Sequence, residues 1–310
     1  MVDDGSAAGS CATVPAMVDT TIVAGHPRLT PHLVLLARRD ERVQIGWSPD
    51  TRLILAPPPG TGAATMIGAL RLLDGQRSLP EVMWRAAERG VDSAAMAAVV
   101  RLLDEAGLLH RQPPPGSDSP LPTLLVVGRG PVADAVGASL RHGTVVDHRT
   151  TWPRTVPTDV AAVVLTDSVV TSPDVVRHLM HDGVPHLPVR CRDGVGVVGP
   201  FVVPGHTACL HCVELTRCDL DREWPYLAAQ LGGRAASASP TTLAATAAFA
   251  VGRVHDFLGD RLPFSQRTTR TRPSALEMGH SQEIDTAAGT VRRRRWRRHP
   301  VCPCSGHAPA

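Results

Sequence analysis

The first clear pattern of hydrophobic and polar positions is a set of three short apolar runs. They lie at residues 32–38, 42–47 and 51–56. Charged residues or a Ser-Pro-Asp turn separate them, which is typical of consecutive strands in a β-meander. Residues 1–28 before them are mainly small and polar, and we interpret them as a disordered arm.

A helical spacing of apolar residues replaces this pattern over residues 61–73. Two further helices are predicted where Ser78 and Asp92 can act as N-caps. Glu81 stands three residues after Ser78, the spacing of a capping box in which each side chain bonds the other residue's free amide. Three strands followed by three helices predict a small winged-helix-like domain over residues 29–111.

A Pro-, Gly- and Ser-rich segment at residues 112–122 is interpreted as a linker, because its composition cannot build a core. After it, strand and helix patterns alternate, which is typical of a doubly wound parallel sheet. Strands are predicted at residues 124–127, 144–147, 161–166, 186–190 and 196–203, and helices at residues 131–140, 173–181 and 240–258. The predicted fold class is therefore α/β, with a Rossmann-type domain over residues 123–310 after the winged-helix-like domain.

Composition narrows the possible functions. The 310 residues carry 32 basic and 29 acidic side chains, and the net charge of 32 − 29 = +3 is too small to indicate nucleic-acid binding by overall charge. All 32 basic residues are arginine, so a mechanism that needs a lysine is excluded for this chain acting alone. No run of 18 or more apolar residues occurs, and residues 1–20 do not resemble a secretory signal. We therefore expect a cytoplasmic protein without a membrane span.

Two pairs of closely spaced cysteines carry the strongest chemical signal. Cys209 and Cys212 form a C-x-x-C pair, and Cys302 and Cys304 form a C-x-C pair about 90 residues later. Each pair can place two thiolates about 2.3 Å from one Zn²⁺, and two pairs complete a tetrahedral site. An accidental spacing or a redox-active C-x-x-C is the alternative, but a redox motif is expected at a helix start after a strand, and Pro-Gly-His at residues 204–206 predicts a loop. We predict a structural zinc that joins the C-terminal tail to the second domain. Four histidines are alternative ligands: His206, His211, His299 and His307.

A glycine-rich turn follows the first predicted strand of the second domain. Residues 128–133 (GRGPVA) match the G-x-G-x-x-A pattern that lets phosphates approach a helix N-terminus. Gly128, Gly130 and Asp147, which is expected at the end of the next strand, make up a candidate nucleotide site. Pro131 removes one of the amides that would hold phosphate, so we interpret the site as vestigial.

An arginine-rich run, residues 292–298 (RRRRWRR), precedes the second cysteine pair. Such a run can bind nucleic acid. However, the rest of the domain is not basic, and the helix predicted after Asp92 has Arg101 as its only basic residue. We therefore interpret the run as a solvated strand or loop leading into the cysteines, and we do not expect a nucleic-acid partner.

The order of these features resembles the ubiquitin-activating-like superfamily that includes ThiF and MoeB. Residues 199–231 (GPFVVPGHTACLHCVELTRCDLDREWPYLAAQL) and residues 296–300 (WRRHP) are more closely similar to one branch of it. That branch is the cyclodehydratase, or leader-peptide-binding, proteins of thiazole/oxazole-modified peptide (TOMM) biosynthesis. Residues 72–109 resemble the helical half of a PqqD-like peptide recognition domain, the RiPP recognition element.

This resemblance implies a role and a set of partners. Members of the family bind the leader of a ribosomal precursor peptide and present its core to a YcaO-type partner, which uses ATP to cyclise Cys, Ser or Thr side chains onto the backbone. The family's zinc ligands carry over to Cys209, Cys212, Cys302 and Cys304. The sequence leaves open whether the chain also forms a homodimer.

The sequence departs from the adenylating members of the superfamily. They carry a G-x-G-G-x-G loop, an asparagine/arginine cluster and a lysine, whereas this chain has GRGPVA, no asparagine over residues 148–159 and no lysine. Asp167 is the only match for their Mg²⁺-binding aspartate. We expect an adenylation fold that has lost its activity, without catalytic residues and without bound ATP or Mg²⁺. The alternative is an ATP-dependent adenylyltransferase acting on a peptide or sulfur-carrier C-terminus.

The resemblance also places the leader peptide on the first domain. An extended peptide can add a strand to an open sheet edge beside a helix. The strand is predicted at residues 52–56 and the helix at residues 92–106. The candidate contacts are Arg52, Ile54, Val100, Arg101 and Asp104.

Overall fold

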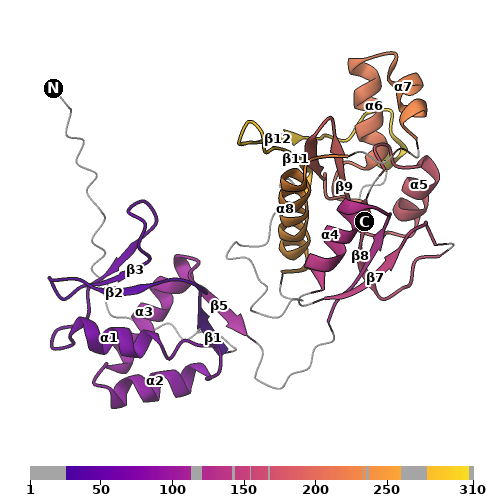
Figure 1. The fold of residues 1–310 in the computed structure, drawn as a ribbon. Helices are drawn as coiled ribbons and strands as arrows, with labels where there is room; N and C mark the ends of the chain where they lie inside the picture. The colour runs from indigo at the N-terminus through magenta and orange to yellow at the C-terminus, as the bar shows by residue number, and fades with distance from the viewer. Residues whose placement is uncertain are drawn as a thin grey trace, which may run out of the picture. The chain divides into compact units, whose positions relative to one another are not determined.

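The computed structural model describes residues 26–112, 121–141, 144–153, 155–166, 168–232, 234, 237–259 and 278–306. The chain divides into two compact units, Met1–Asp118 and Ser119–Ala310, which are described separately as unit 1 and unit 2 (Figure 1). Of the predicted arm at residues 1–28 and the predicted linker at residues 112–122, only the ends fall within the described residues.

The three strands expected near the start of unit 1 form an antiparallel meander. They are β2 (Leu35–Ala37), β3 (Val43–Ile45) and β4 (Leu53–Leu55), and they pair in that order. Val43 and Ile45 are fully buried, and their cross-strand partners Leu55 and Leu53 lie on the same, inner face. The alternation that predicted these strands therefore also identifies the face that joins the core.

Helices α1 (Ala63–Leu70), α2 (Leu79–Glu88) and α3 (Ser93–Glu105) supply the rest of the core of unit 1. Ser78 caps α2 by accepting a hydrogen bond from the Glu81 amide, and Asp92 caps α3. The predicted capping box forms only in part, because the Glu81 carboxylate accepts a hydrogen bond from Arg85 at 3.0 Å. A guanidinium one helical turn away competes with the free amide for this carboxylate.

A two-stranded sheet completes unit 1 and shortens the predicted arm. β1 (His26–Leu29) pairs antiparallel with β5 (Leu109–Gln112), so residues 26–28 belong to a strand and not to a disordered arm. Pro27 is the only one of the four residues of β1 that is buried, and one buried position is too weak a pattern to predict a strand.

The described residues of unit 2 hold a mixed sheet of seven strands, in the order β12-β11-β10-β9-β8-β6-β7. Four strands pair in parallel: β6 (Thr123–Val127), β7 (Val145–Arg149), β8 (Val160–Thr166) and β9 (His186–Arg192). Three pair antiparallel: β10 (Val195–Val198), β11 (His280–Asp285) and β12 (Thr290–Arg295). The expectation of a wholly parallel sheet is wrong, because a two-residue turn at Asp193 and Gly194, both with positive φ, joins β9 to β10 as a hairpin.

Helices cover both faces of this sheet (Figure 1). Helices α4 (Pro131–Leu140) and α8 (Pro240–Leu258) pack on one face, and α5 (Pro173–His181) and α6 (Leu210–Leu220) pack on the other, with α7 (Trp224–Leu231) beside α6. Alternate residues of β6 accordingly enter two separate cores, Leu124 and Val126 in one and Leu125 and Val127 in the other. This architecture confirms the Rossmann-type interpretation of the second half of the chain.

Residues 292–295 of the arginine-rich run lie in β12, the strand at the outer edge of the sheet. Every residue of β12 is exposed, and β12 pairs with β11 alone among the described strands. This agrees with the interpretation as a solvated strand, and charged edge strands resist unwanted pairing with other chains. Among the described helices, none combines the length and apolar character needed to cross a bilayer.

Candidate metal centre

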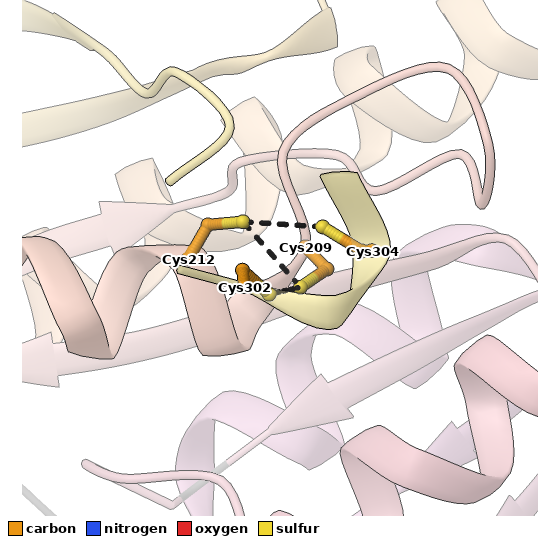
Figure 2. Close-up of side chains that lie close together, drawn as sticks. All are labelled: Cys209, Cys212, Cys302 and Cys304. Atoms are coloured by element: carbon orange, nitrogen blue, oxygen red, sulfur yellow. Dashed lines mark hydrogen bonds between the residues drawn. The ribbon is translucent and has the colours of Figure 1, made fainter. Parts of the chain in front are cut away.

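Two segments far apart in the sequence bring the four paired cysteines together (Figure 2). Cys209 is the N-cap residue of α6 and Cys212 lies in its first turn, so the C-x-x-C pair does stand at a helix start, and what favours metal over redox chemistry is its contact with Cys302 and Cys304. Cys304 lies in the short 3₁₀ helix η3 (Pro303–Gly306), and Cys302 is the residue directly before this helix. Trp296 fixes the approach to η3, because its indole N–H donates a hydrogen bond to Ser281 Oγ at 2.9 Å.

The sulfur atoms have the spacing of a tetrahedral metal site. Cys209 Sγ lies 3.7 Å from Cys212 Sγ and 3.5 Å from Cys302 Sγ, and Cys212 Sγ lies 3.2 Å from Cys304 Sγ. All four sulfurs lie within 4.8 Å of one another. A Zn–S bond of about 2.3 Å implies sulfur atoms about 3.8 Å apart, whereas a disulfide needs about 2.05 Å. The four cysteines therefore fit a divalent metal ion and do not fit a disulfide pair.

The environment of the cluster also favours a cation. Cys209, Cys212 and Cys302 are buried, and Cys304 is half-buried. Hydrogen bonding from the Cys209 thiol lowers the pKa of Cys212 to about 4, while the same hydrogen bond raises the pKa of Cys209. Burial raises the pKa of Cys302 to about 12. Several thiolates can therefore share this small buried volume only when a positive ion balances them.

Three of the four alternative histidine ligands fall within the described residues, and these three lie outside the cluster. His299 uses both ring nitrogens elsewhere: Nε2 lies 2.8 Å from Asp219 Oδ2, and Nδ1 accepts a hydrogen bond from the Val301 amide. Its carbonyl accepts a hydrogen bond from the Cys302 amide at 3.0 Å, so His299 holds the loop that carries a ligand. Neither His206 nor His211 belongs to the group of possible metal ligands found among the described residues, and His307 lies outside them. No sequence signal pairs Asp219 with His299, because they are 80 residues apart.

The residues of the predicted nucleotide site have other roles in the structure. Asp147 lies within β7, which continues to Arg149, so its expected position at the strand end is wrong. Its carboxylate forms an ion pair with Arg149 at 2.8 Å. Gly128 approaches β8 so closely that a Cβ atom there would lie 2.1 Å from Thr166 Oγ1. Gly130 is the N-cap of α4, and Asp167 lies outside the described residues.

The residues of the predicted peptide site lie on two elements of unit 1. Arg52 is exposed just before β4, and Ile54 is half-buried within it. On α3, Arg101 and Asp104 are half-buried, but Val100 is fully buried in the core. Val100 is therefore a packing residue with no surface to offer a peptide.

No family model matches this sequence, and no curated protein matches it. Solved structures do match its fold. A heterocyclase in complex with substrate and cofactor aligns with a TM-score of 0.63 and 17% identity, over 91% of this chain and 39% of that chain. The heterocyclase TruD aligns with a TM-score of 0.60 and 17% identity, over 91% of this chain and 43% of that chain. MccB of E. coli aligns with a TM-score of 0.53 and 11% identity, over 90% of this chain and 99% of that chain.

These likenesses confirm the expected resemblance at the level of fold: the chain shares the fold of these heterocyclases and of MccB. The chain has the fold of part of a heterocyclase, and it spans about two fifths of the length of the two heterocyclases. At these identities the likeness concerns architecture, and activity has to be argued from the chain's own residues.

Proposed function

We propose that this protein binds the leader of a ribosomal precursor peptide and presents its core to a separate YcaO-type cyclodehydratase. Two features support this proposal. The fold of both units corresponds to part of a heterocyclase that was solved with its substrate, and the residues of an adenylation site are missing or otherwise engaged. In this interpretation unit 1 is a winged-helix-like recognition domain, a RiPP recognition element, and unit 2 is an inactive adenylation fold that serves as a scaffold.

The open edge of β4 is the observation that carries the proposal. Among the described strands, β4 pairs only with β3. Backbone bonds from Arg38 to Arg42 and from Gly46 to Val34 show that even-numbered residues of β2 and β3 bond each other across this pair. The backbone N–H and C=O groups of the odd-numbered residues of β3 must then bond β4. Ile54 lies opposite the even-numbered Gln44, so its own N–H and C=O point away from β3, to the open edge.

The side chains around this edge suit a peptide that carries both apolar and charged residues. Arg52 is exposed and Ile54 is only half-buried, on the face of β4 opposite the core. A leader that adds a strand here would gain main-chain hydrogen bonds from Ile54 and side-chain contacts from both residues. Arg101 and Asp104 of α3 remain candidate contacts.

A pair of proline substitutions tests this docking site. Ile54→Pro removes an amide that points away from the sheet, so unit 1 should stay folded while leader binding falls at least tenfold. Ala37→Pro is the matched control, because by the same alternation Ala37 points its amide to the opposite open edge, at β2. The probes are synthetic leaders of precursor peptides encoded beside this gene, measured by fluorescence anisotropy. Equal binding by folded Ile54→Pro and the wild-type protein would refute the proposal.

The competing function is ATP-dependent adenylation, and the nucleotide-site residues argue against it. Asp147 forms an ion pair with Arg149, Pro131 removes an amide from the start of α4, and the chain has no lysine for the phosphates. Calorimetry with ATP and Mg²⁺ should detect no binding at micromolar nucleotide. Micromolar binding that is lost in Asp147→Ala would instead support the adenylyltransferase.

We also propose that the metal held by Cys209, Cys212, Cys302 and Cys304 is a structural zinc. Four sulfur ligands close the coordination sphere and leave no position for a substrate, which is the pattern of structural sites. The ion would join η3, and through it the strand β12, to the start of α6. Elemental analysis of the purified protein should find one zinc per chain, and a protein without bound metal would contradict the proposal.

A further inference from the structure

Arg190 is a buried cation whose guanidinium is not matched by an ion pair among the described residues. It lies on β9 and is 5% exposed. Its neighbours Val189 and Cys191 enter the core beneath α8, so the Arg190 side chain points to the opposite face, where α6 packs. Within the described part of the chain, its guanidinium forms no hydrogen bond or ion pair.

Arg192 and Arg217 lie within electrostatic reach of Arg190, and Arg294 lies within reach of Arg217; these four arginines are here called the arginine cluster. Arg192 lies 3.3 Å from Glu283, and Arg217 lies 2.9 Å from Glu214. Glu214 attracts Arg190 and Arg217, and Glu283 attracts Arg217, but each glutamate already forms an ion pair with its own arginine. Counted over these described residues, the cluster and its two glutamates carry four positive and two negative charges, an excess of two.

The remaining contacts of the cluster leave this excess charge in place. Arg294 lies over the Trp296 ring, 4.4 Å from its centre, and Arg217 lies 4.9 Å from the centre of the Trp224 ring. Aromatic rings hold guanidinium planes in position but bring no negative charge. Burial and the repulsion from Arg217 lower the pKa of Arg190 to about 10, which still leaves it charged near pH 7.

We propose that the arginine cluster binds an oxyanionic group, a carboxylate or a phosphate, with Arg190 as the central donor. A buried guanidinium without a counter-ion destabilises the fold, and an oxyanion supplies the two parallel acceptors that its planar fork fits. The site lies on the α6 face of the unit 2 sheet and is distinct from the leader-binding edge proposed on β4 of unit 1. It would hold an acidic peptide side chain or a phosphorylated ligand.

Titration calorimetry on the full chain tests this site with two probes, inorganic pyrophosphate and a hexaglutamate peptide. Wild-type protein should bind at least one of them, and the stronger probe identifies the chemical class. Arg190→Met should weaken that binding at least tenfold, and Arg190→Lys should weaken it less, because it keeps the charge but loses the fork. Arg177→Met is the matched control: Arg177 lies on α5, its side chain is 72% exposed, and its loss changes the net charge equally.

Stability separates loss of a ligand site from loss of the fold. Arg190→Met replaces an unpaired buried charge by an apolar chain, so without ligand its Tm should equal or exceed that of the wild type. Added pyrophosphate or hexaglutamate should raise the Tm of the wild type and of Arg177→Met only. Two results would overturn the proposal: no binding of either probe by wild type at millimolar concentration, or equal binding by Arg190→Met, Arg190→Lys and Arg177→Met.

Discussion

Gly128 shows how one residue can satisfy a functional motif for a structural reason. Its φ is +143°, and a Cβ atom would lie 2.1 Å from Thr166 Oγ1 and 2.6 Å from the Thr166 carbonyl oxygen. The glycine is therefore required by the close approach of β6 to β8, whether or not phosphate binds. The first glycine of a G-x-G-x-x-A pattern thus indicates the fold more directly than the ligand.

Replacing this glycine should destabilise unit 2. We expect Gly128→Ala to lower the free energy of unfolding by about 3 kcal/mol, because it adds backbone strain to a steric clash with backbone atoms. Gly137→Ala on α4 is the control, since its nearest neighbour would be His148 Nδ1 at 4.0 Å and alanine favours a helix. Urea unfolding of both variants provides the measurement, and equal stabilities would show that the β6–β8 contact is not tight.

His186 makes stability depend on pH. The residue is fully buried with Nδ1 bonded to the Val184 carbonyl, and burial lowers its pKa to about 4 from an ordinary 6.5. Above about pH 6.5 the imidazole ring is neutral in both the folded and the unfolded chain. As the pH falls below about 6.5, the unfolded chain takes up a proton on this ring before the folded chain does. The free energy of unfolding should therefore fall by up to ~3 kcal/mol from His186 alone as the pH drops from about 6.5 to about 4.

Chemical denaturation across this pH range, compared between wild type and His186→Asn, isolates the contribution. The asparagine can keep a donor near the Val184 carbonyl but takes up no proton, so its profile should be flatter. His181→Asn removes an exposed histidine and should leave the wild-type slope unchanged. An identical slope in wild type and His186→Asn would contradict this assignment.

At the scale of elements, helix boundaries follow from local signals. Helices α4, α5 and α8 begin and end at the predicted residues, and each has proline in its first position, where the missing N–H has no intrahelical partner in any case. The N-cap of α2 is equally local, since Ser78 Oγ accepts from the Glu81 amide.

The cap should therefore have a measurable share in the stability of unit 1. We expect Ser78→Ala to lower its free energy of unfolding by about 1 kcal/mol, whereas Ser78→Gly should lower it by only a few tenths. The measurement is denaturant unfolding of the full chain, followed by circular dichroism at the transition of unit 1. If both variants unfold together with the wild type, the cap contributes nothing to stability.

At the scale of the whole chain, the four-cysteine cluster brings the region after β12 to the start of α6. We expect Cys302→Ser to release the zinc and to speed hydrogen exchange in β11, β12 and the first turn of α6, because metal binding free energy contributes directly to folding. Cys218→Ser is the control: Cys218 lies on α6 outside the cluster. A Cys302→Ser protein that keeps one zinc and wild-type exchange rates would show that this ligand set is wrong.

The sequence by itself determined the features whose causes lie within a few residues. N-cap residues and prolines determined where helices begin, and the alternation of apolar and polar residues determined the strands of the meander. Two closely spaced cysteine pairs indicated one set of candidate metal ligands. The tertiary structure decided what depends on distant pairing. The hairpin from β9 to β10 made the sheet mixed, β11 gave the arginine-rich β12 its only described neighbour, and β7 ran on to Arg149 and placed Asp147 within a strand. In the sequence Arg190 resembles an ordinary strand residue, and only the packing of α6 on the sheet brings Arg217 close to it, because charge accumulates through contacts between elements that no local pattern records.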